Sequence, residues 1–168
     1  MATTEGGGLR MDRDLLARIP IFGGLPAAVL DRMLEGASVQ SIPAGVQLMG
    51  EGELARSVFV VMEGELEIRK RGTHGSEVRV AVLRPGDCVG EMSLIDIQPR
   101  SATVRSLTPA ALVRLDHTEI ARLYKANPEV YTLLVLNIAR EISRRLRRAD
   151  QVLADLSVVV EEMWSCQN

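Results

Sequence analysis

Short apolar runs, separated at close intervals by turn residues, fill the middle of the chain and constrain its fold more than any other feature. The runs have the β-branched content and spacing of strands, at 39–42, 46–49, 58–62, 66–69, 78–83, 102–106 and 111–116. The breaks contain Pro43, Gly45, Gly50, Gly52, Glu63, Gly64, Gly72, Gly75, Pro85 and Gly86. Because such turns join neighbouring strands directly, the pattern predicts seven or eight antiparallel strands in a roll or sandwich.

Helical patterns lie on both sides of this region. Apolar spacing at 12–19 and 26–35 predicts two short N-terminal helices. Pro26 suits a first helical position, and Gly36 suits a C-terminal cap. A single helical turn is predicted at 93–96, where it interrupts the strands.

The chain then returns to helical spacing at 118–125. After Asn127 and Pro128 it continues nearly to its end without Gly or Pro, which predicts a helix of about 35 residues. The expected fold is therefore mainly β with helices: a double-stranded β-helix, also called a β-roll or jelly roll. It should carry N-terminal helices, a short inserted helix and a long C-terminal helix.

A length of 168 residues suits one domain with an appendage. We expect a flexible tail at 1–10, helices and roll at 11–126, and a lid and dimerisation helix at 127–168. Aromatic residues make up 3% of the chain, so the core must be aliphatic.

The C-terminal helix carries a heptad stripe. Its apolar positions alternate steps of four and three residues at Ile142, Leu146, Ala149, Leu153, Leu156, Val160 and Met163. This spacing is the seam of a coiled coil and predicts a parallel homodimer. The alternative is that the stripe packs back on the roll of its own chain.

Several function classes are disfavoured by composition. The net charge of -2 provides no general attraction to nucleic acid or to an acidic membrane. Cys88 and Cys166 lie far apart without nearby histidines, which argues against a metal site and fits a reducing compartment. No leader or 18-residue apolar run is present, so we expect a cytoplasmic protein without a membrane contact.

No catalytic residues are predicted, because neither His74 nor His117 has partners arranged for nucleophilic chemistry. Cys88 could act as a redox sensor near a helix N-terminus, although a small core residue is the more frequent role of such a cysteine. The expectation is a binding protein and not an enzyme.

The segment 84–104 indicates an anion site. Gly90 lets the backbone approach a ligand, and the amides of the following helical turn lack intrahelical partners. Arg100 brings a planar guanidinium to the same place, suited to bidentate contact with a phosphate, and Ser101 and the Ala102 amide could add contacts. Glu91 would repel a phosphate but can accept a hydrogen bond from a sugar hydroxyl.

Phosphate and hydroxyl together indicate a nucleotide-like ligand. The competing interpretation is a buried ion pair between Glu91 and Arg100 that ties a loop to the roll.

These residues resemble the phosphate-binding cassette of the cyclic nucleotide-binding domain family. In that family a Gly-Glu pair opens the cassette helix, as Gly90 and Glu91 do here, and a Pro-Arg-Ser-Ala-Thr type of run closes it, as at 99–103. The similarity covers about residues 18–150 and includes 19–22, 50–52, 59–61 and Gly64.

The resemblance implies that Glu91 binds the ribose 2′-hydroxyl and that Arg100 binds the cyclic phosphate. It also implies that the C-terminal helix closes over the base, which would rest on apolar residues such as Val80. The ligand-binding residues implied are Val80, Val89, Gly90, Glu91, Met92, Ser93, Arg100, Ser101 and Ala102.

The sequence also departs from the family pattern. Cys88 replaces a large apolar residue, Ser93 stands where alanine is common, and the C-terminal helix lacks the Thr-Ser pair that reads adenine in the catabolite activator. The ligand is therefore left open between cAMP and cGMP. Arg144, Arg145 and Arg148 are candidate lid or base contacts, and a solvated helix face with Glu141 is the alternative.

The expected function is a non-catalytic cyclic nucleotide receptor that signals to an unknown protein partner. Direct DNA binding is not expected, because too few residues follow Val160 for a helix-turn-helix domain. A ligand-independent interaction scaffold, a cyclic di-GMP effector that uses Arg100 and the helix arginines, and a regulatory fragment of a larger protein are the alternatives.

Overall fold

The structure is a computed structural model that describes residues 13–73, 75–96 and 98–165. The expected tail at 1–10 lies outside the described residues, as do His74 and Cys166.

Three short helical elements open the described chain. They are α1 (Arg13–Ala17), the 3-10 helix η1 (Pro20–Phe22) and α2 (Ala27–Glu35). The helix predicted at 12–19 ends early because Pro20 starts a separate turn, in which the Phe22 amide donates to the Ile19 carbonyl. Pro26 is the N-cap residue of α2 and not its first helical residue, and Gly36 is the C-cap.

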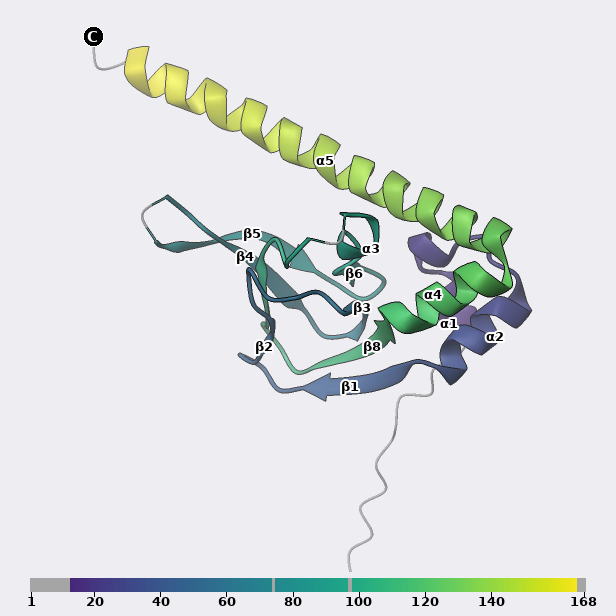
Figure 1. Cartoon of the computed structure of the whole chain (residues 1–168). Coiled ribbons are helices and arrows are strands. Elements are labelled where there is room, and N and C mark those ends of the chain that lie inside the picture. Colours follow the sequence, from purple (N-terminus) through teal and green to yellow (C-terminus); the bar gives the residue numbers. More distant parts are fainter. Residues whose placement is uncertain (1–12, 74, 97, 166–168) are drawn as a thin grey trace, which may run out of the picture.

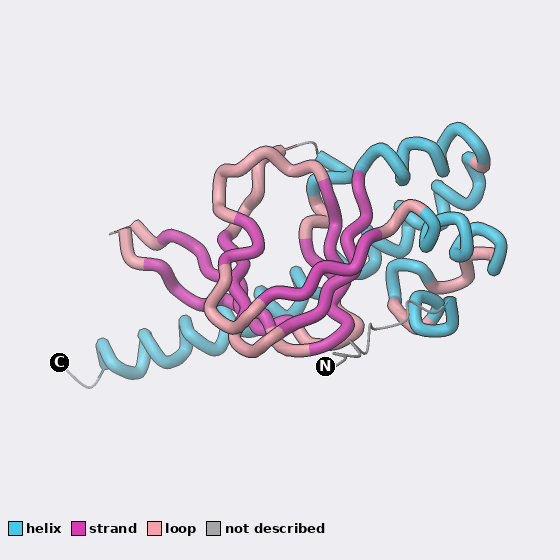
Figure 2. The backbone as a smooth tube through the Cα atoms, turned by 90° about the horizontal axis from the view of Figure 1, so that it is seen from below, coloured by secondary structure: helices cyan, strands magenta, loops and turns pink. Residues whose placement is uncertain are grey.

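The described residues contain eight strands in two four-stranded sheets, and all strand pairs are antiparallel. One sheet has the order β1-β8-β3-β6 and the other β2-β7-β4-β5. The strands are β1 (Ser38–Ile42), β2 (Gln47–Met49), β3 (Ser57–Glu63), β4 (Leu66–Arg71), β5 (Glu77–Leu83), β6 (Cys88–Val89), β7 (Thr103–Ser106) and β8 (Ala110–Asp116). The β-roll prediction is confirmed, and Figure 2 shows the strands curling around a common interior, with most helices gathered at one side and the long C-terminal helix running past the strands.

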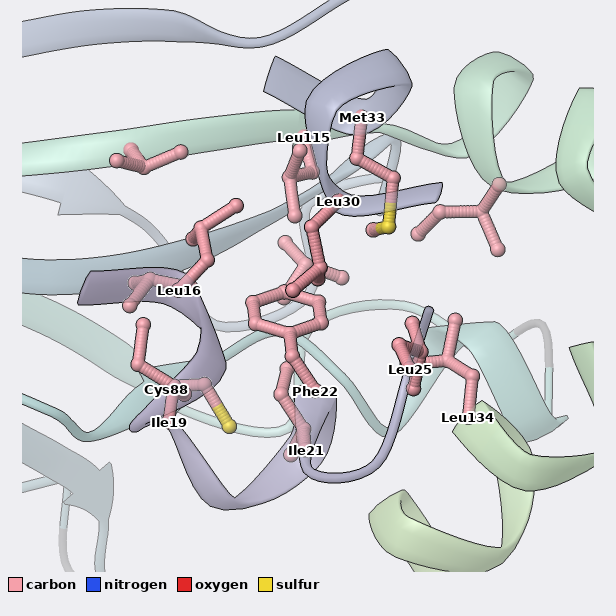
Figure 3. Packing of buried hydrophobic residues seen from close by; sticks show 14 of the residues in the cluster. Leu16, Ile19, Ile21, Phe22, Leu25, Leu30, Met33, Cys88, Leu115 and Leu134 are labelled. Atoms are coloured by element: carbon pink, nitrogen blue, oxygen red, sulfur yellow. The ribbon is translucent and has the colours of Figure 1, made fainter. Parts of the chain in front are cut away.

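The hydrophobic core has two clusters, and strand β3 contributes side chains to both of them. It is buried on both faces, so it reads as a continuous apolar run without alternation. Phe59 and Val61 face the interior of the roll, while Val58, Val60 and Met62 join the cluster beneath the helices. Figure 3 shows that second cluster, in which Phe22 lies at the centre of a shell of aliphatic side chains.

Two helices close the fold, α4 (His117–Ala126) and α5 (Pro128–Ser165). The predicted long helix is therefore confirmed, with 38 residues. Its first turns bury Val130, Leu134 and Ile138 against the N-terminal helices. Figure 1 shows that α5 then crosses over the roll and extends past β5.

The heptad stripe of α5 does not pack on the roll of its own chain. Ile142 is partly buried against the core, whereas Leu146, Leu153, Val160 and Met163 are each at least half exposed. The alternative in which the stripe folds back is therefore wrong for this structure. No helix among the described residues has both the length and the apolar content that crossing a bilayer requires.

Asn137 fixes the start of α5 to the N-terminal helices. Its side chain is buried, and its amide donates to the carbonyl oxygens of Gly23 (2.8 Å) and Ile21 (3.3 Å). Its own oxygen accepts from Arg140 at 3.0 Å. These bonds satisfy two carbonyls that η1 leaves without helical partners.

We expect Asn137→Ala to lower the free energy of unfolding by roughly 1–3 kcal/mol, because two carbonyls lose their donor in a buried setting. Urea unfolding followed by circular dichroism measures this. Gln151→Ala, on the exposed part of the same helix, is the control and should change stability by less than about 0.5 kcal/mol. Equal effects of the two substitutions would show that Asn137 does not anchor the helix.

Candidate functional site

The site is built where β6 ends and the chain turns into α3 (Ser93–Asp96). Gly90, at this turn, has a φ of 86°. A Cβ atom on residue 90 would lie 2.9 Å from the Ser57 carbonyl oxygen and would collide with the Arg100 guanidinium. Glycine is therefore required both by the backbone conformation and by the close approach of Arg100.

After α3 the chain comes back to the turn at Gly90, and Arg100 lies at that point. Two backbone hydrogen bonds hold it against the loop after β2. The Arg100 amide donates to the Glu53 carbonyl, and the Gly52 amide donates to the Arg100 carbonyl, both at 2.8 Å. Its side chain is buried and donates to the carbonyls of Ser57 (2.6 Å) and Gly90 (3.4 Å). A guanidinium has five N–H donors, so these two bonds leave donors for a further acceptor.

Glu91 is the other charged residue of the site, and its side chain is only 3% exposed. Its carboxylate accepts a hydrogen bond from Arg145 of α5 at 2.8 Å. Arg145 also donates to the Cys88 carbonyl (2.7 Å) and to Glu141 (3.2 Å). The competing interpretation of a Glu91–Arg100 ion pair is therefore wrong for this structure, because the partner of Glu91 is an arginine of the long helix.

Burial disfavours the charged forms of these groups, so it shifts the pKa of the acid and the pKa of the bases in opposite directions. It raises the pKa of Glu91, although the positive charge of Arg145 counteracts the shift. It lowers the pKa of Arg100, and the carboxylates of Glu53 and Glu91 oppose that shift. Burial also acts to lower the pKa of Arg145, but Glu91, Cys88 and Glu141 outweigh it and the net shift is upward.

A cavity of about 130 Å³ lies between the cassette, β4 and β7. Most of the predicted ligand-binding residues line it, namely Val89, Gly90, Glu91, Met92, Ser93, Arg100, Ser101, Ala102 and Arg145. An apolar wall of Met49, Ile68 and Val104 lies among the same lining residues. The sequence reasoning did not identify this wall, although Ile68 and Val104 are cross-strand partners that the alternation of β4 and β7 could have indicated.

Three residues that were predicted to contact the ligand lie away from the cavity. Val80 lies on β5 and is 59% exposed; Ala81 is the residue opposite Ile68, and the register shift after that pair leaves Val80 without a cross-strand partner. Arg144 pairs with Glu141, and Arg148 is exposed on α5. None of these three side chains lines the cavity that the described residues form.

The departures from the cassette pattern have structural reasons. Cys88 is buried in the core cluster, and burial, with the nearby Glu91 carboxylate, raises the pKa of its thiol to about 12. The thiol is therefore protonated at neutral pH, which does not favour a redox role. Ser93 donates to the Gly90 carbonyl at 2.7 Å and lies 3.3 Å from Nε2 of His117. Burial and the charge of Arg100 lower the pKa of His117.

Known proteins with similar sequences include nucleotide-responsive regulators. The chain is 28% identical over 143 residues to the CRP-like cAMP-activated global transcriptional regulator of Mycobacterium tuberculosis. It is 31% identical over 138 residues to the cyclic AMP receptor protein of Thermus thermophilus. These matches cover 85% and 82% of this chain, which spans 62% of the length of each relative.

Solved structures agree with this similarity. The N-terminal domain of a transcriptional regulator from Streptomyces coelicolor matches with a TM-score of 0.68 and 31% identity, over 82% of this chain and 96% of that domain. The Thermus thermophilus catabolite activator protein matches with a TM-score of 0.69 and 31% identity, over 82% of this chain and 63% of its own. A cyclic nucleotide-binding domain from Methylobacillus flagellatus, 21% identical, shares the fold with a TM-score of 0.78 over 85% of this chain and 83% of that one.

Residues 39–127, which are more than half of the chain and include the whole cassette, match the family model of the cyclic nucleotide-binding domain. The chain therefore belongs to the cyclic nucleotide-binding domain family.

Proposed function

We propose that this chain is a receptor for a cyclic mononucleotide, cAMP or cGMP, and that it regulates other molecules without catalysing a reaction. One observation carries the proposal: a buried arginine and a buried glutamate line the same small cavity as the apolar wall. A cyclic nucleotide has a phosphate, a ribose hydroxyl and an apolar base face that match these three surfaces.

Arg100 is assigned to the cyclic phosphate. Its position is already fixed by two carbonyl bonds, so little side-chain entropy is lost when it binds. Ser101 and the backbone amide of Ala102 are the neighbouring donors for the same phosphate. Glu91 is assigned to the ribose 2′-hydroxyl, and the base is assigned to the wall of Met49, Ile68 and Val104.

Arg145 links the nucleotide to the long helix. It holds Glu91, so a ribose hydroxyl that binds the same carboxylate must share it with Arg145 or displace Arg145. Either change acts directly on α5, because Arg145 belongs to that helix. We propose that α5 transmits nucleotide binding in this way to a dimer partner or to another protein.

Two alternative functions fit the geometry less well. Cyclic di-GMP has two phosphates, yet Arg144 and Arg148 do not line the cavity and Arg145 is engaged by Glu91. A ligand-independent scaffold has no need of a buried guanidinium whose hydrogen bonds go to carbonyls and not to a carboxylate.

Arg100→Ala tests the phosphate assignment. We expect isothermal titration with cAMP and cGMP to give at least roughly 100-fold weaker binding, because charge-assisted bonds contribute about 1.5–3 kcal/mol each. Arg148→Ala removes the same charge from an exposed position and should bind like the unchanged protein. If Arg100→Ala and Arg148→Ala behave alike, Arg100 does not hold the phosphate, and absence of heat with either nucleotide in the unchanged protein contradicts the receptor proposal.

The raised pKa of Glu91 predicts how affinity depends on pH. The carboxylate form accepts the ribose hydroxyl, so affinity for cAMP should be full at neutral pH and should fall as the pH drops through the raised pKa. The fall should begin above the ordinary value of 4.5. In Glu91→Gln, affinity should be weaker at neutral pH and should lack this component.

His117 and Glu141 are present in both proteins, so the difference between their two pH profiles isolates Glu91. Binding measured by titration between pH 4 and pH 8 decides the assignment. Parallel profiles would remove Glu91 from the ribose contact.

We further propose that the chain forms a parallel homodimer through the exposed heptad stripe of α5. Sedimentation velocity at concentrations on the order of tens of micromolar should show a dimer. Leu153→Glu, in the seam, should convert it to a monomer, because a carboxylate is costly at a core position. Ala154→Glu adds the same charge beside the seam and should leave the dimer intact. A monomer for the unchanged protein is the contrary result.

A further inference from the structure

From Val152 onward, the apolar face of α5 is wider than a two-stranded coiled coil requires. When Ile142 is counted as position d, the seam residues Leu153, Leu156, Val160 and Met163 fall at positions a and d. Val152 and Val159 then fall at g, next to the seam, and Trp164 falls at e. From Val152 onward these side chains are each at least half exposed in the chain.

The preceding part of the same helix lacks this extra stripe. There the g position holds Arg145, which pairs with Glu91, and the e positions hold Ser143 and Asp150. Two apolar positions in seven are the pattern of a two-stranded seam, whereas a third at e or g is the pattern of a helix that packs in a bundle. Residues 152–164 are therefore patterned to contact more than one neighbouring helix.

Charge indicates what kind of helix fits there. Asp155 and Glu162 lie at position c beside the Val152 and Val159 stripe, and Asp150 and Glu161 lie along the other edge of the apolar face. After Arg148 the sequence contains no Lys, Arg or His. Both edges are thus acidic, and further copies of the same chain would bring like charges together. A helix with basic edges would neutralise them.

We propose that the distal section of α5, residues 150–164, docks a partner protein through an amphipathic helix whose apolar face is bordered by Lys and Arg. The partner helix covers Val152, Val159 and Trp164 and pairs its basic edges with the four carboxylates. This section forms the end of α5 that is remote from the N-terminal helices, on the side of the roll toward which β4 and β5 extend (Figure 1). The proposal goes beyond the nucleotide receptor and does not depend on it.

The test uses the full chain and a synthetic amphipathic peptide with Leu at positions a, d and g and Lys at its edges. Trp164 is the single tryptophan of the chain, so its fluorescence reports directly on this surface. We expect saturable binding with a blue shift, weakened by salt. A peptide with Glu in place of every Lys should not bind.

Variants locate the docking surface on the helix. Val152→Gln combined with Val159→Gln should weaken binding of the Lys peptide at least tenfold. Val158→Gln is the matched control, because Val158 is equally exposed but lies at position f on the opposite face. It should bind like the unchanged chain. All three positions are exposed, and circular dichroism verifies that the helix is retained.

Several results would overturn the proposal. They are no fluorescence shift with the Lys peptide, equal binding of the Lys and Glu peptides, and equal loss of binding in Val158→Gln and in the double variant. A chain that sediments as a tetramer without peptide, and that the double variant reduces to a dimer, would show that further copies occupy the surface.

Discussion

The guanidinium of Arg100 lies in the protein interior, and its two hydrogen bonds go to the carbonyl oxygens of Ser57 and Gly90. A carbonyl bears only a partial charge, so these bonds position the group without neutralising it. Burying a cation whose charge is not neutralised is costly, and burial therefore lowers the pKa of Arg100. The remaining structure is arranged to keep it there. Gly90 leaves the space that a Cβ would take, and backbone bonds clamp the Arg100 residue to the loop after β2.

The second charged residue of the site, Glu91, connects the roll to the long helix. Without Arg145 it would be a buried carboxylate with no ion-pair partner, which is a strongly destabilising arrangement. The ion pair therefore couples the position of α5 to the state of the cavity. A ligand hydroxyl that binds Glu91 changes the environment of Arg145 at the same time, so the coupling needs no further element.

The long helix changes role along its length. Its first turns are core, with Val130, Leu134 and Ile138 buried and Asn137 bonded to the turn of η1. The next turn carries Arg145 to the cavity, and Glu141 accepts a hydrogen bond from Arg145. Beyond Leu146 the side chains are exposed, and the pattern widens from a two-position seam to a three-position face. One continuous helix thus joins the core, the candidate nucleotide site and an exposed apolar face.

The residue pattern by itself determined much of this protein. Turn residues at short intervals specified the roll, since Gly and Pro select tight connections, and the Gly-Glu and Pro-Arg pairs placed the cassette. The absence of Gly and Pro after Pro128 specified the long helix, and periodicity specified its seam. These are local properties, because backbone preference and side-chain period act over a few residues. The two-residue strand β6 was missed because Cys88 and Val89 are too few to show a period.

Only the tertiary structure decided which distant residues meet. Arg145 and not Arg100 is the partner of Glu91, a choice among similar arginines that depends on how α5 crosses the roll. Met49, Ile68 and Val104 form the apolar wall, while Val80 lies outside the cavity, at the register shift between β4 and β5. A shift of register moves side chains between the faces of a sheet. Its position depends on both paired strands, so the sequence of one strand does not predict it.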